Sequence, residues 1–357
     1  MPSFLIKYNK LESIIIMMHS STIFQICFLL QLVLTPLSAS TTQRCHPEDQ
    51  KALLQIKKDL NNPAALSSWQ TTTDCCRHWK LVSCDRGKTH RVNSLSLENI
   101  DMNPHPLPMP ASVSALPYLT ILGFGPGNFT GPIPSSIVNL KSLHTLQVTS
   151  TLLSGTIPEF LSQITTLTDL SLSFNNLSGE IPASLSRLSH LQSLDLQSNS
   201  LSGPIPDIFD SFPNFTFLYL SSNQLSGKIP KSMGNINVTY LYLDNNKLEG
   251  DASMLFGSKK DTWTINLANN KKLAFDLGKV EFSYELQILN LSHNEIYGNI
   301  PEVLTAVRDL VSVDLSYNNL CGKIPTGLSS IATASAFAHN KCLCGSPLPS
   351  CSRRRSF

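Results

Sequence analysis

The segment Leu194-Asp-Leu-Gln-Ser-Asn-Ser-Leu-Ser-Gly-Pro-Ile-Pro206 decides the fold of this chain, because close copies of it recur along most of the sequence. Each copy opens with two leucines one residue apart, continues to an asparagine and a third leucine, and closes on Gly-x-Ile-Pro. The closing prolines lie 24 residues apart within two blocks. They are Pro134, Pro158, Pro182, Pro206 and Pro230 in the first block, and Pro301 and Pro325 in the second.

A period of this length, within the range of about 20 to 29 residues, is the signature of a leucine-rich repeat solenoid. Each unit supplies one short strand whose leucines point inward and whose intervening residue points outward, because strand side chains alternate. We therefore predict an α/β repeat solenoid: a right-handed curved array of about ten repeats over residues 92–325, with a parallel β-sheet on its concave face. The first inward positions of the expected strands are Leu95, Leu122, Leu146, Leu170, Leu194, Leu218, Leu241, Ile265, Leu289 and Val313.

Asparagines follow these strands at a constant offset, where the chain turns inward and leaves backbone groups without strand partners. A side-chain amide both donates and accepts, so stacked asparagines can satisfy neighbouring turns, and we interpret them as structural. In the closing signal we expect the glycine to permit a tight turn and the proline to end strand pairing. The asparagines are Asn175, Asn199, Asn223, Asn246, Asn270, Asn294 and Asn318.

Three stretches depart from the regular repeat. Residues 248–252 and 273–278 replace the Gly-x-Ile-Pro signal, yet the strand positions survive in both, so we expect the array to continue through them. A proline-rich stretch, Pro104 to Pro110, follows the first strand. We expect it to form an irregular loop on the convex side, because the repeat phase resumes directly after it.

Nine cysteines occur, and eight of them bracket the repeats in two groups of four. A solenoid must seal both ends of its core, and disulfide-stapled caps do so in oxidising compartments. We therefore expect a secreted protein with an N-terminal cap over residues 41–91 and a C-terminal cap over residues 326–352. Pairing within each cap leaves several connectivities open, and a zinc site is a poor alternative because the Cys-x-Cys spacing is wrong. The eight cysteines are Cys45, Cys75, Cys76, Cys84, Cys321, Cys342, Cys344 and Cys351.

Residues 1–40 are expected to form a removable signal peptide, because residues 22–37 are mostly apolar and small residues precede Thr41. A signal anchor is the alternative, and initiation at Met17 or Met18 would give a leader of more ordinary length. No later apolar run reaches the length of about 20 residues that a membrane helix needs. We therefore expect no transmembrane anchor after the signal is removed.

The chain has a net charge of only +2, which argues against nucleic acid as a partner because nucleic-acid binding depends on phosphate neutralisation. No nucleophile-elbow or His-Glu-x-x-His motif occurs, so we expect neither an enzyme nor a metal or other cofactor. A basic tail occupies residues 353–357. We interpret it as a frayed, solvated end, with binding to an acidic polysaccharide as the alternative.

Five Asn-x-Ser/Thr sequons are candidate glycosylation sites in a secreted chain. One acceptor, Asn290, lies between Leu289 and Leu291 and is therefore expected on the concave face. A glycan there would obstruct a partner over the ninth repeat, so either the site is unoccupied or the partner binds elsewhere. The five acceptors are Asn128, Asn176, Asn214, Asn237 and Asn290.

The outward strand positions of repeats six to eight hold a cluster of aromatic residues bordered by carboxylates. Exposed aromatic side chains are typical anchors of protein interfaces, and the inward leucines already account for the core. For Trp263, packing at the edge of the sheet is an equal alternative. The candidate partner-binding residues are Asp169, Asp195, Gln197, Phe217, Tyr219, Tyr240, Tyr242, Asp244, Trp263 and Asn266.

Four stretches are more specific than the repeats themselves. They are Cys45-His-Pro-Glu-Asp-Gln-Lys-Ala-Leu-Leu-Gln-Ile-Lys-Lys58, Asp74-Cys75-Cys76, Leu248-Glu-Gly-Asp-Ala-Ser253 and Lys341-Cys-Leu-Cys-Gly-Ser-Pro-Leu-Pro-Ser-Cys351. On these stretches the whole mature chain resembles plant polygalacturonase-inhibiting proteins. The resemblance implies four disulfides: Cys45 with Cys75, Cys76 with Cys84, Cys321 with Cys342, and Cys344 with Cys351.

The resemblance also implies a function. It suggests an apoplastic or wall-associated protein that binds secreted fungal, sometimes insect, endopolygalacturonases and slows pectin cleavage. We expect a steric mechanism, in which the concave face covers the rim of the hydrolase cleft. Pectin or homogalacturonan in the wall is a second candidate ligand.

The chain departs from the family pattern on the concave face. Inhibitors of this type present several acidic residues together between strands four and seven. This chain instead has Ser171, Tyr219 and Tyr242 at between-leucine positions there, and keeps only Asp195. An inhibitor of narrow range, or one that has lost inhibition, is therefore an open alternative.

Two other functions fit the same fold. A soluble extracellular accessory of a receptor kinase would bind its ligand on the same concave face. Ice binding occurs in a relative of this fold, although an aromatic concave face favours a protein partner. We expect an inhibitor.

Overall fold

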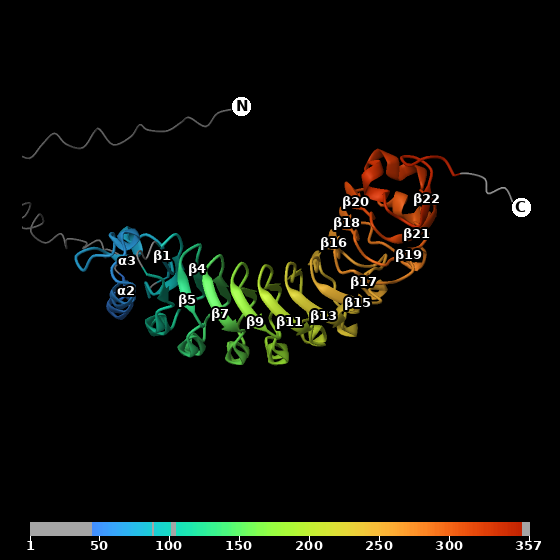
Figure 1. Ribbon diagram of the computed structural model, residues 1–357. Helices are drawn as coiled ribbons and strands as arrows, with labels where there is room; N and C mark the ends of the chain where they lie inside the picture. The colour runs from blue at the N-terminus through green and yellow to red at the C-terminus, as the bar shows by residue number, and fades with distance from the viewer. Residues whose placement is uncertain (1–44, 88, 101–104, 352–357) are drawn as a thin grey trace, which may run out of the picture. The chain divides into compact units, whose positions relative to one another are not determined.

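The computed structural model describes residues 45–351, apart from residue 88 and residues 101–104. The expected signal peptide and basic tail lie outside these residues. The described chain is a solenoid in which 3₁₀ turns line the convex side and a long sheet lines the concave side (Figure 1). No helix within this part of the chain has the length and apolar character needed to span a membrane.

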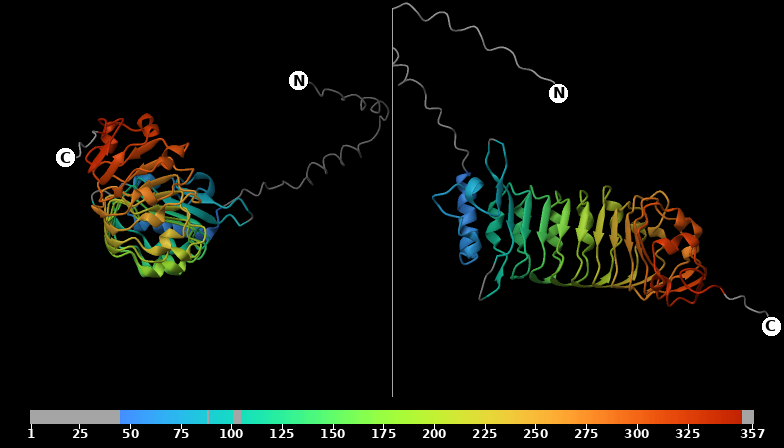
Figure 2. Two further views of the ribbon diagram at one scale, coloured as in Figure 1. Left: turned by 90° about the vertical axis from the view of Figure 1, so that its right-hand side faces the viewer. Right: turned by 90° about the horizontal axis from the view of Figure 1, so that it is seen from above.

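The concave sheet has 11 strands, and its ten repeat strands run parallel in sequence order (Figure 2). The first strand, β1, pairs antiparallel with β2 and belongs to the N-terminal cap. The strands are β1 (Val82–Cys84), β2 (Val92–Leu97), β4 (Ile121–Phe124), β6 (Thr145–Val148), β8 (Asp169–Ser171), β10 (Ser193–Asp195), β12 (Phe217–Tyr219), β14 (Tyr240–Tyr242), β16 (Thr264–Asn266), β18 (Ile288–Asn290) and β20 (Ser312–Asp314).

The repeat leucines fill the core, as the sequence predicts. Leu194 pairs in register with Leu170 on one side and Leu218 on the other, and all three are at most 1% exposed. Burying a leucine side chain stabilises a fold by about 1.5 to 3 kcal/mol, so the stacked leucines supply most of the driving force. Because each unit buries its leucines only against its neighbours, every repeat depends on the next one.

The structure contains a second, eight-stranded sheet that the repeat pattern did not predict. Short parallel strands form at the third leucine of most repeats, and those in repeats with a closing proline end before that proline, which precedes the 3₁₀ turn. The proline-rich stretch predicted to be an irregular loop contributes one of these strands, β3. The strands are β3 (Leu107–Pro108), β5 (Phe129–Gly131), β7 (Leu152–Thr156), β9 (Asn176–Gly179), β11 (Ser200–Pro204), β13 (Gln224–Lys228), β15 (Lys247–Gly250) and β17 (Lys272–Leu273).

The geometry of the second sheet requires the glycine of the Gly-x-Ile-Pro signal. Gly203 has a φ of +76°, and an added Cβ would approach the side chain of Glu180 to 2.7 Å. A residue with a side chain would therefore be strained and crowded at this position. The two degenerate stretches keep the sheet going through β15 and β17, which confirms that the array continues through them.

The convex side consists of 3₁₀ turns in place of regular helices. Most of these turns return the chain from the second sheet to the next concave strand, and the last one leads into the C-terminal cap. The turns are η2 (Ala111–Ala115), η3 (Ser135–Asn139), η4 (Glu159–Gln163), η5 (Ala183–Arg187), η6 (Phe209–Ser211), η7 (Lys231–Gly234), η8 (Ser253–Leu255), η9 (Leu277–Lys279), η10 (Glu302–Ala306) and η11 (Thr326–Ser330).

The buried asparagines tie neighbouring turns together, which confirms their structural interpretation. Nδ2 of Asn223 donates to the backbone oxygens of Leu196 (3.0 Å), Leu220 (3.2 Å) and Ser221 (3.3 Å), while its Oδ1 accepts from the backbone nitrogen of Leu201 (3.0 Å). Donor bonds of the same kind recur at the other asparagines of the series. One amide per repeat thus joins two successive units.

Disulfides close both ends of the array. The structure forms the four pairs that the resemblance implies, two in each cap. The N-terminal cap contains α2 (Pro47–Asp59), η1 (Ala64–Leu66), α3 (Cys75–His78) and β1, and the C-terminal cap contains η12 (Ala334–Phe337) and β22 (Cys342–Cys344). Strand β22 joins β19 (Tyr297–Gly298) and β21 (Asn319–Lys323) of the last repeats in a third, three-stranded sheet. The close sulfur cluster of Cys45, Cys75 and Cys76 is held in disulfides, so it offers no thiolate to a metal.

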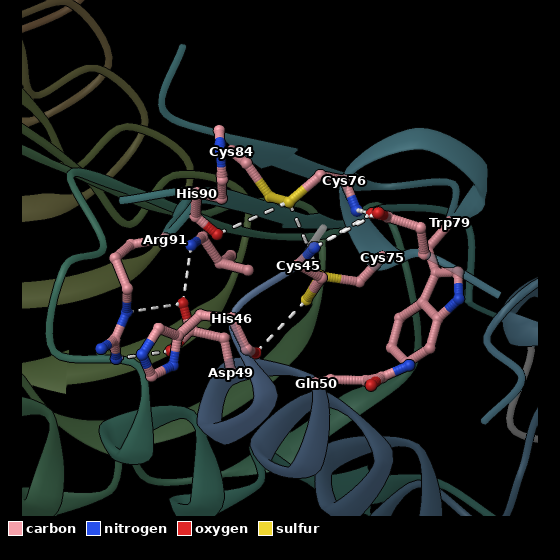
Figure 3. Close-up of a disulfide and its surroundings, with 12 residues drawn as sticks. Cys45, His46, Asp49, Gln50, Cys75, Cys76, Trp79, Cys84, His90 and Arg91 are labelled. Atoms are coloured by element: carbon pink, nitrogen blue, oxygen red, sulfur yellow. Dashed lines mark hydrogen bonds and ion pairs between the residues drawn. A yellow bond between two sulfur atoms is a disulfide. The ribbon is translucent and has the colours of Figure 1, made fainter. Parts of the chain in front are cut away.

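A buried ion pair fastens the N-terminal cap to the first repeat (Figure 3). The guanidinium of Arg91 donates to both carboxylate oxygens of Asp49, at 3.0 and 2.6 Å, and the backbone nitrogen of Val92 donates to the same carboxylate at 2.7 Å. Arg91 also lies over the ring of Tyr118, 4.3 Å from its centroid. The pair is saturated with hydrogen bonds, so neither charge is buried alone.

We expect Asn223→Ala to lower the free energy of unfolding by about 3 kcal/mol or more, because it leaves several buried backbone groups without partners. Urea unfolding of the disulfide-intact protein measures this loss. Asn235→Ala is the control, since Asn235 is exposed and bonds only to Asp210 on the surface. Equal stabilities of the two variants would contradict the role of the buried amide.

Candidate protein-binding face

The aromatic candidates meet on the outward side of β12 and β14. Phe217 stacks on Tyr240 with ring centroids 5.6 Å apart, and Tyr219 stacks on Tyr242 at 5.3 Å. The register of the two strands sets both pairs directly opposite each other. Trp263 continues the row, with its ring edge-on to Tyr240 at 6.0 Å and 38% of its surface exposed. Trp263 therefore belongs to this group, which we name the aromatic patch: Phe217, Tyr219, Tyr240, Tyr242 and Trp263.

The aromatic patch is partly desolvated by its own stacking. Burial raises the pKa of Tyr219 above its ordinary value, and the neighbouring Tyr242, Tyr240 and Asp195 raise it further. The phenol therefore stays protonated over a wider pH range than a free tyrosine. A neutral phenol held between stacked rings can donate a hydrogen bond to a partner while its ring supplies apolar contact.

The bordering carboxylates are held in fixed orientations. Asp195 accepts from the backbone nitrogen of Gln197 (3.2 Å) through Oδ1 and from the hydroxyl of Ser171 (3.0 Å) through Oδ2. Asp244 accepts from the hydroxyl of Ser221 and from the side-chain amide of Asn245. Because these bonds fix the side chains in advance, a partner that binds them loses less conformational entropy.

The two remaining candidates lie at the ends of the group. Asp169 of β8 accepts from the hydroxyl of Thr168 at 2.6 Å. Asn266 of β16 accepts from the backbone nitrogen of Ala268 at 3.2 Å, which is the arrangement also found at Asp195. All ten candidates thus lie on one sheet face over repeats four to eight.

Charged residues are distributed unevenly between the two sheets. A count of charged residues at the outward positions of the sequence could have shown this feature. The outward segments run from two residues before the first inward position of each repeat strand to the asparagine position after the strand: 93–99, 120–127, 144–151, 168–175, 192–199, 216–223, 239–246, 263–270, 287–294 and 311–318. They contain no lysine or arginine. Their acidic residues are Glu98, Asp169, Asp195, Asp244 and Asp314.

Cations lie instead on the second sheet and the convex flank. Lys228, Lys247 and Lys272 belong to β13, β15 and β17. Lys260 donates to the backbone oxygens of Gly234 and Ile236, and burial lowers its pKa. The concave face therefore has an acidic and aromatic character that the nearly neutral whole chain conceals.

We expect alkaline titration of tyrosine absorbance to place Tyr219 above the ordinary pKa of 10.0. The difference between wild type and Tyr219→Phe isolates this group. The folded state holds the Tyr219 proton more tightly than the unfolded state does. The resulting stability is therefore complete below the ordinary pKa and is lost as the pH rises through the folded-state pKa. A difference midpoint at or below 10.0 would contradict the burial of this phenol.

Comparison with known proteins places the chain in a family. A leucine rich repeat N-terminal domain matches residues 46–85, and leucine rich repeat models match residues 141–201, 165–225, 189–248, 285–306 and 309–331. Among solved structures, a plant ice-binding protein is 43% identical with a TM-score of 0.82, covering 87% of this chain and 99% of that one. The plant peptide hormone receptor RGFR1 in complex with RGF2 is 27% identical with a TM-score of 0.53, covering 71% of this chain and 43% of that one.

The curated relatives are more specific. Polygalacturonase inhibitor 2 of Phaseolus vulgaris is 54% identical over 325 residues, which cover 90% of this chain and 94% of that protein. Similarity at this level over nine-tenths of the chain exceeds what the repeat pattern alone would produce. The chain belongs to the polygalacturonase inhibitor family of leucine-rich repeat proteins.

Proposed function

We propose that the chain is a secreted plant defence protein that binds and inhibits microbial endopolygalacturonases in the cell wall. The observation that carries this proposal is the aromatic patch, bordered by fixed carboxylates on a face without lysine or arginine. Stacked, half-exposed aromatic rings are the residues that dominate interface energetics. The chain acts as a binding module, and its residues take no part in covalent chemistry.

Charge complementarity supports an endopolygalacturonase as the partner. Its substrate is a chain of galacturonate carboxylates, so a cleft that binds this polymer needs cationic residues along its rim. A face that offers Asp169, Asp195 and Asp244 and no cation meets such a rim favourably. The bound inhibitor then blocks entry of the polymer by steric covering. Fungal enzymes are the expected targets, with insect enzymes as a second group.

The wall location follows from the same chemistry. Four disulfides fit an oxidising extracellular compartment, which for a plant protein is the apoplast. Pectin or homogalacturonan is a second candidate ligand, since Lys228, Lys247 and Lys272 present ammonium groups on consecutive strands of the second sheet. Such contacts would leave the concave face free for the protein partner.

A soluble accessory that binds a ligand beside a receptor kinase is the alternative. The likeness to a plant peptide hormone receptor favours it, because that protein has a similar fold. Assaying reducing-end release by a panel of fungal and insect endopolygalacturonases decides between the two. Inhibition of any member supports the proposal. A folded, disulfide-bonded sample that inhibits none, and that co-purifies with a receptor kinase ectodomain, supports the alternative.

Truncating the patch should abolish most of the binding. We expect Tyr219→Ala combined with Tyr242→Ala to weaken inhibition by about 30-fold or more, the effect of losing a hot spot of about 2 kcal/mol. Tyr297→Ala is the matched control, because Tyr297 is 49% exposed but lies on β19, away from the concave sheet. Secretion and melting temperature should stay near wild type in both variants. Full inhibition by the double variant would rule out this placement of the site.

Neutralising the carboxylates that border the aromatic patch should slow association with the endopolygalacturonase. We expect Asp195→Asn combined with Asp244→Asn to lower the association rate at low salt and to flatten its salt dependence, because amides keep the shape without the charge. The control is Asp309→Asn, at an exposed carboxylate on a turn outside the strands. Stopped-flow kinetics measures both. An unchanged salt dependence in the double variant would contradict charge steering by this face.

A further inference from the structure

A modification sequon lies on the floor of the concave face. Asn290 is the last residue of β18, where it pairs in register with Asn266 and Asp314, and Leu291-Ser292 completes the sequon. Figure 1 shows β16, β18 and β20 following one another along the inner side of the C-terminal repeats. An N-linked sugar at this position would therefore project over the sheet that carries the aromatic patch.

The carboxamide of Asn290 is already oriented for such a linkage. Its Oδ1 accepts from the backbone nitrogen of Ser292 at 3.1 Å and from the Ser292 hydroxyl at 2.8 Å. Nδ2, the atom that carries an N-linked sugar, makes no hydrogen bond to any described residue. By contrast, Nδ2 of Asn237 donates to Asp261 at 2.5 Å, and Oδ1 of Asn237 accepts from the same residue at 2.7 Å. A glycan on Asn290 thus displaces no existing bond.

The sheet around Asn290 offers room for a sugar. At the position between the two leucines its neighbours are Asn266 and Asp314, whereas repeats six and seven carry the larger Tyr219 and Tyr242 there. The floor over β16, β18 and β20 is therefore lower than the aromatic patch. We name this lower floor, with the rows on either side of it, the C-terminal trough.

Exposed rings and aliphatic side chains border the trough. On one side His293, Tyr317 and His339 form a continuous stack, with ring centroids 4.2 and 4.1 Å apart. On the other side Ile288 and Val311 are 36% and 67% exposed. Exposed apolar surface of this kind commonly marks a covered or interacting region. The C–H faces of pyranose rings pack well on such surfaces, while their hydroxyls remain in water.

We propose that Asn290 carries an N-linked glycan that lies in the C-terminal trough and limits access of a protein partner to repeats nine and ten. The glycan itself requires only passage through the secretory pathway, which the four disulfides support. Its effect on a partner rests on the proposed function. Glycan occupancy then regulates how much of the concave face can bind.

The size of a stable protein interface brings a partner on the concave face into competition with the glycan on Asn290. A stable protein interface uses roughly 20 to 30 residues on each side. Each repeat presents about three outward residues on its strand segment, so such an interface spans about seven or more of the repeats. A partner centred on the aromatic patch in repeats six to eight therefore reaches repeat nine, where Asn290 lies.

The first test needs no partner. Protein secreted from plant cells is digested to identify the glycan on the Asn290 peptide, and hydroxyl-radical labelling then compares wild type with Ser292→Ala and Ser292→Thr. Ser292→Ala removes the sequon but keeps Asn290, whereas Ser292→Thr keeps the sequon and the hydroxyl. We expect Asn290 to be occupied in wild type and Ser292→Thr, with Tyr317 labelled about threefold more slowly than in Ser292→Ala. An unoccupied Asn290, or equal labelling of Tyr317, would overturn the proposal.

The second test measures binding of an endopolygalacturonase that the wild-type protein inhibits. We expect Ser292→Ala and Asn290→Gln to bind about tenfold more tightly than wild type. Asn176→Gln is the matched control, because it removes a sequon from β9 of the second sheet and should leave affinity unchanged. Unchanged affinity of the Asn290 variants would overturn the regulatory claim. If the wild type inhibits no enzyme, the proposed function fails, and the labelling result alone still decides whether the glycan covers the trough.

Discussion

The structure depends on one hydrogen-bonding arrangement, the asparagine that follows each of the seven concave strands from β8 to β20. A solenoid leaves backbone groups unpaired wherever the chain turns from one sheet toward the next, and burial makes each unpaired group costly. The amide of Asn223 meets this requirement with three carbonyl oxygens and one backbone nitrogen drawn from two successive repeats. Because the same bonds recur along the array, the repeats stack in register and the leucines stay buried.

This stacking explains why the outward face can be specific. Register sets Phe217 opposite Tyr240 and Tyr219 opposite Tyr242, so the rings stack on strands that the core already holds in place. The inward side chains pack in the core and stabilise the fold. The outward side chains contribute little to the core, so they can vary without loss of the fold. The charge separation has the same origin, since the carboxylates border the concave face while Lys228 and Lys247 lie on the second sheet.

Much of the fold could be predicted from the sequence, because the repeat period fixes the strands, the inward leucines and the asparagine ladder. The second sheet could not, because its strands are short and one of them, β11, includes Pro204, a residue type that usually ends strand pairing. Within the site, the alternation of inward and outward side chains along each strand was enough to predict that the tyrosines lie on the outward face. The edge-on contact of Trp263 with Tyr240 needed coordinates, because Trp263 lies just outside its strand. The ring stack beside Asn290 also needed the structure, because the 24-residue spacing of His293 and Tyr317 sets them in one row without showing that their rings stack.

The central claim is that the outward face of the concave sheet is the protein-binding surface. Hydrogen–deuterium exchange of the protein, alone and in complex with an endopolygalacturonase that it inhibits, tests this claim most directly. We expect slower exchange in peptides that contain β10, β12, β14 and β16, with no change in β9, β11 and β13 of the second sheet. Protection confined to the second sheet or to the convex turns would contradict it.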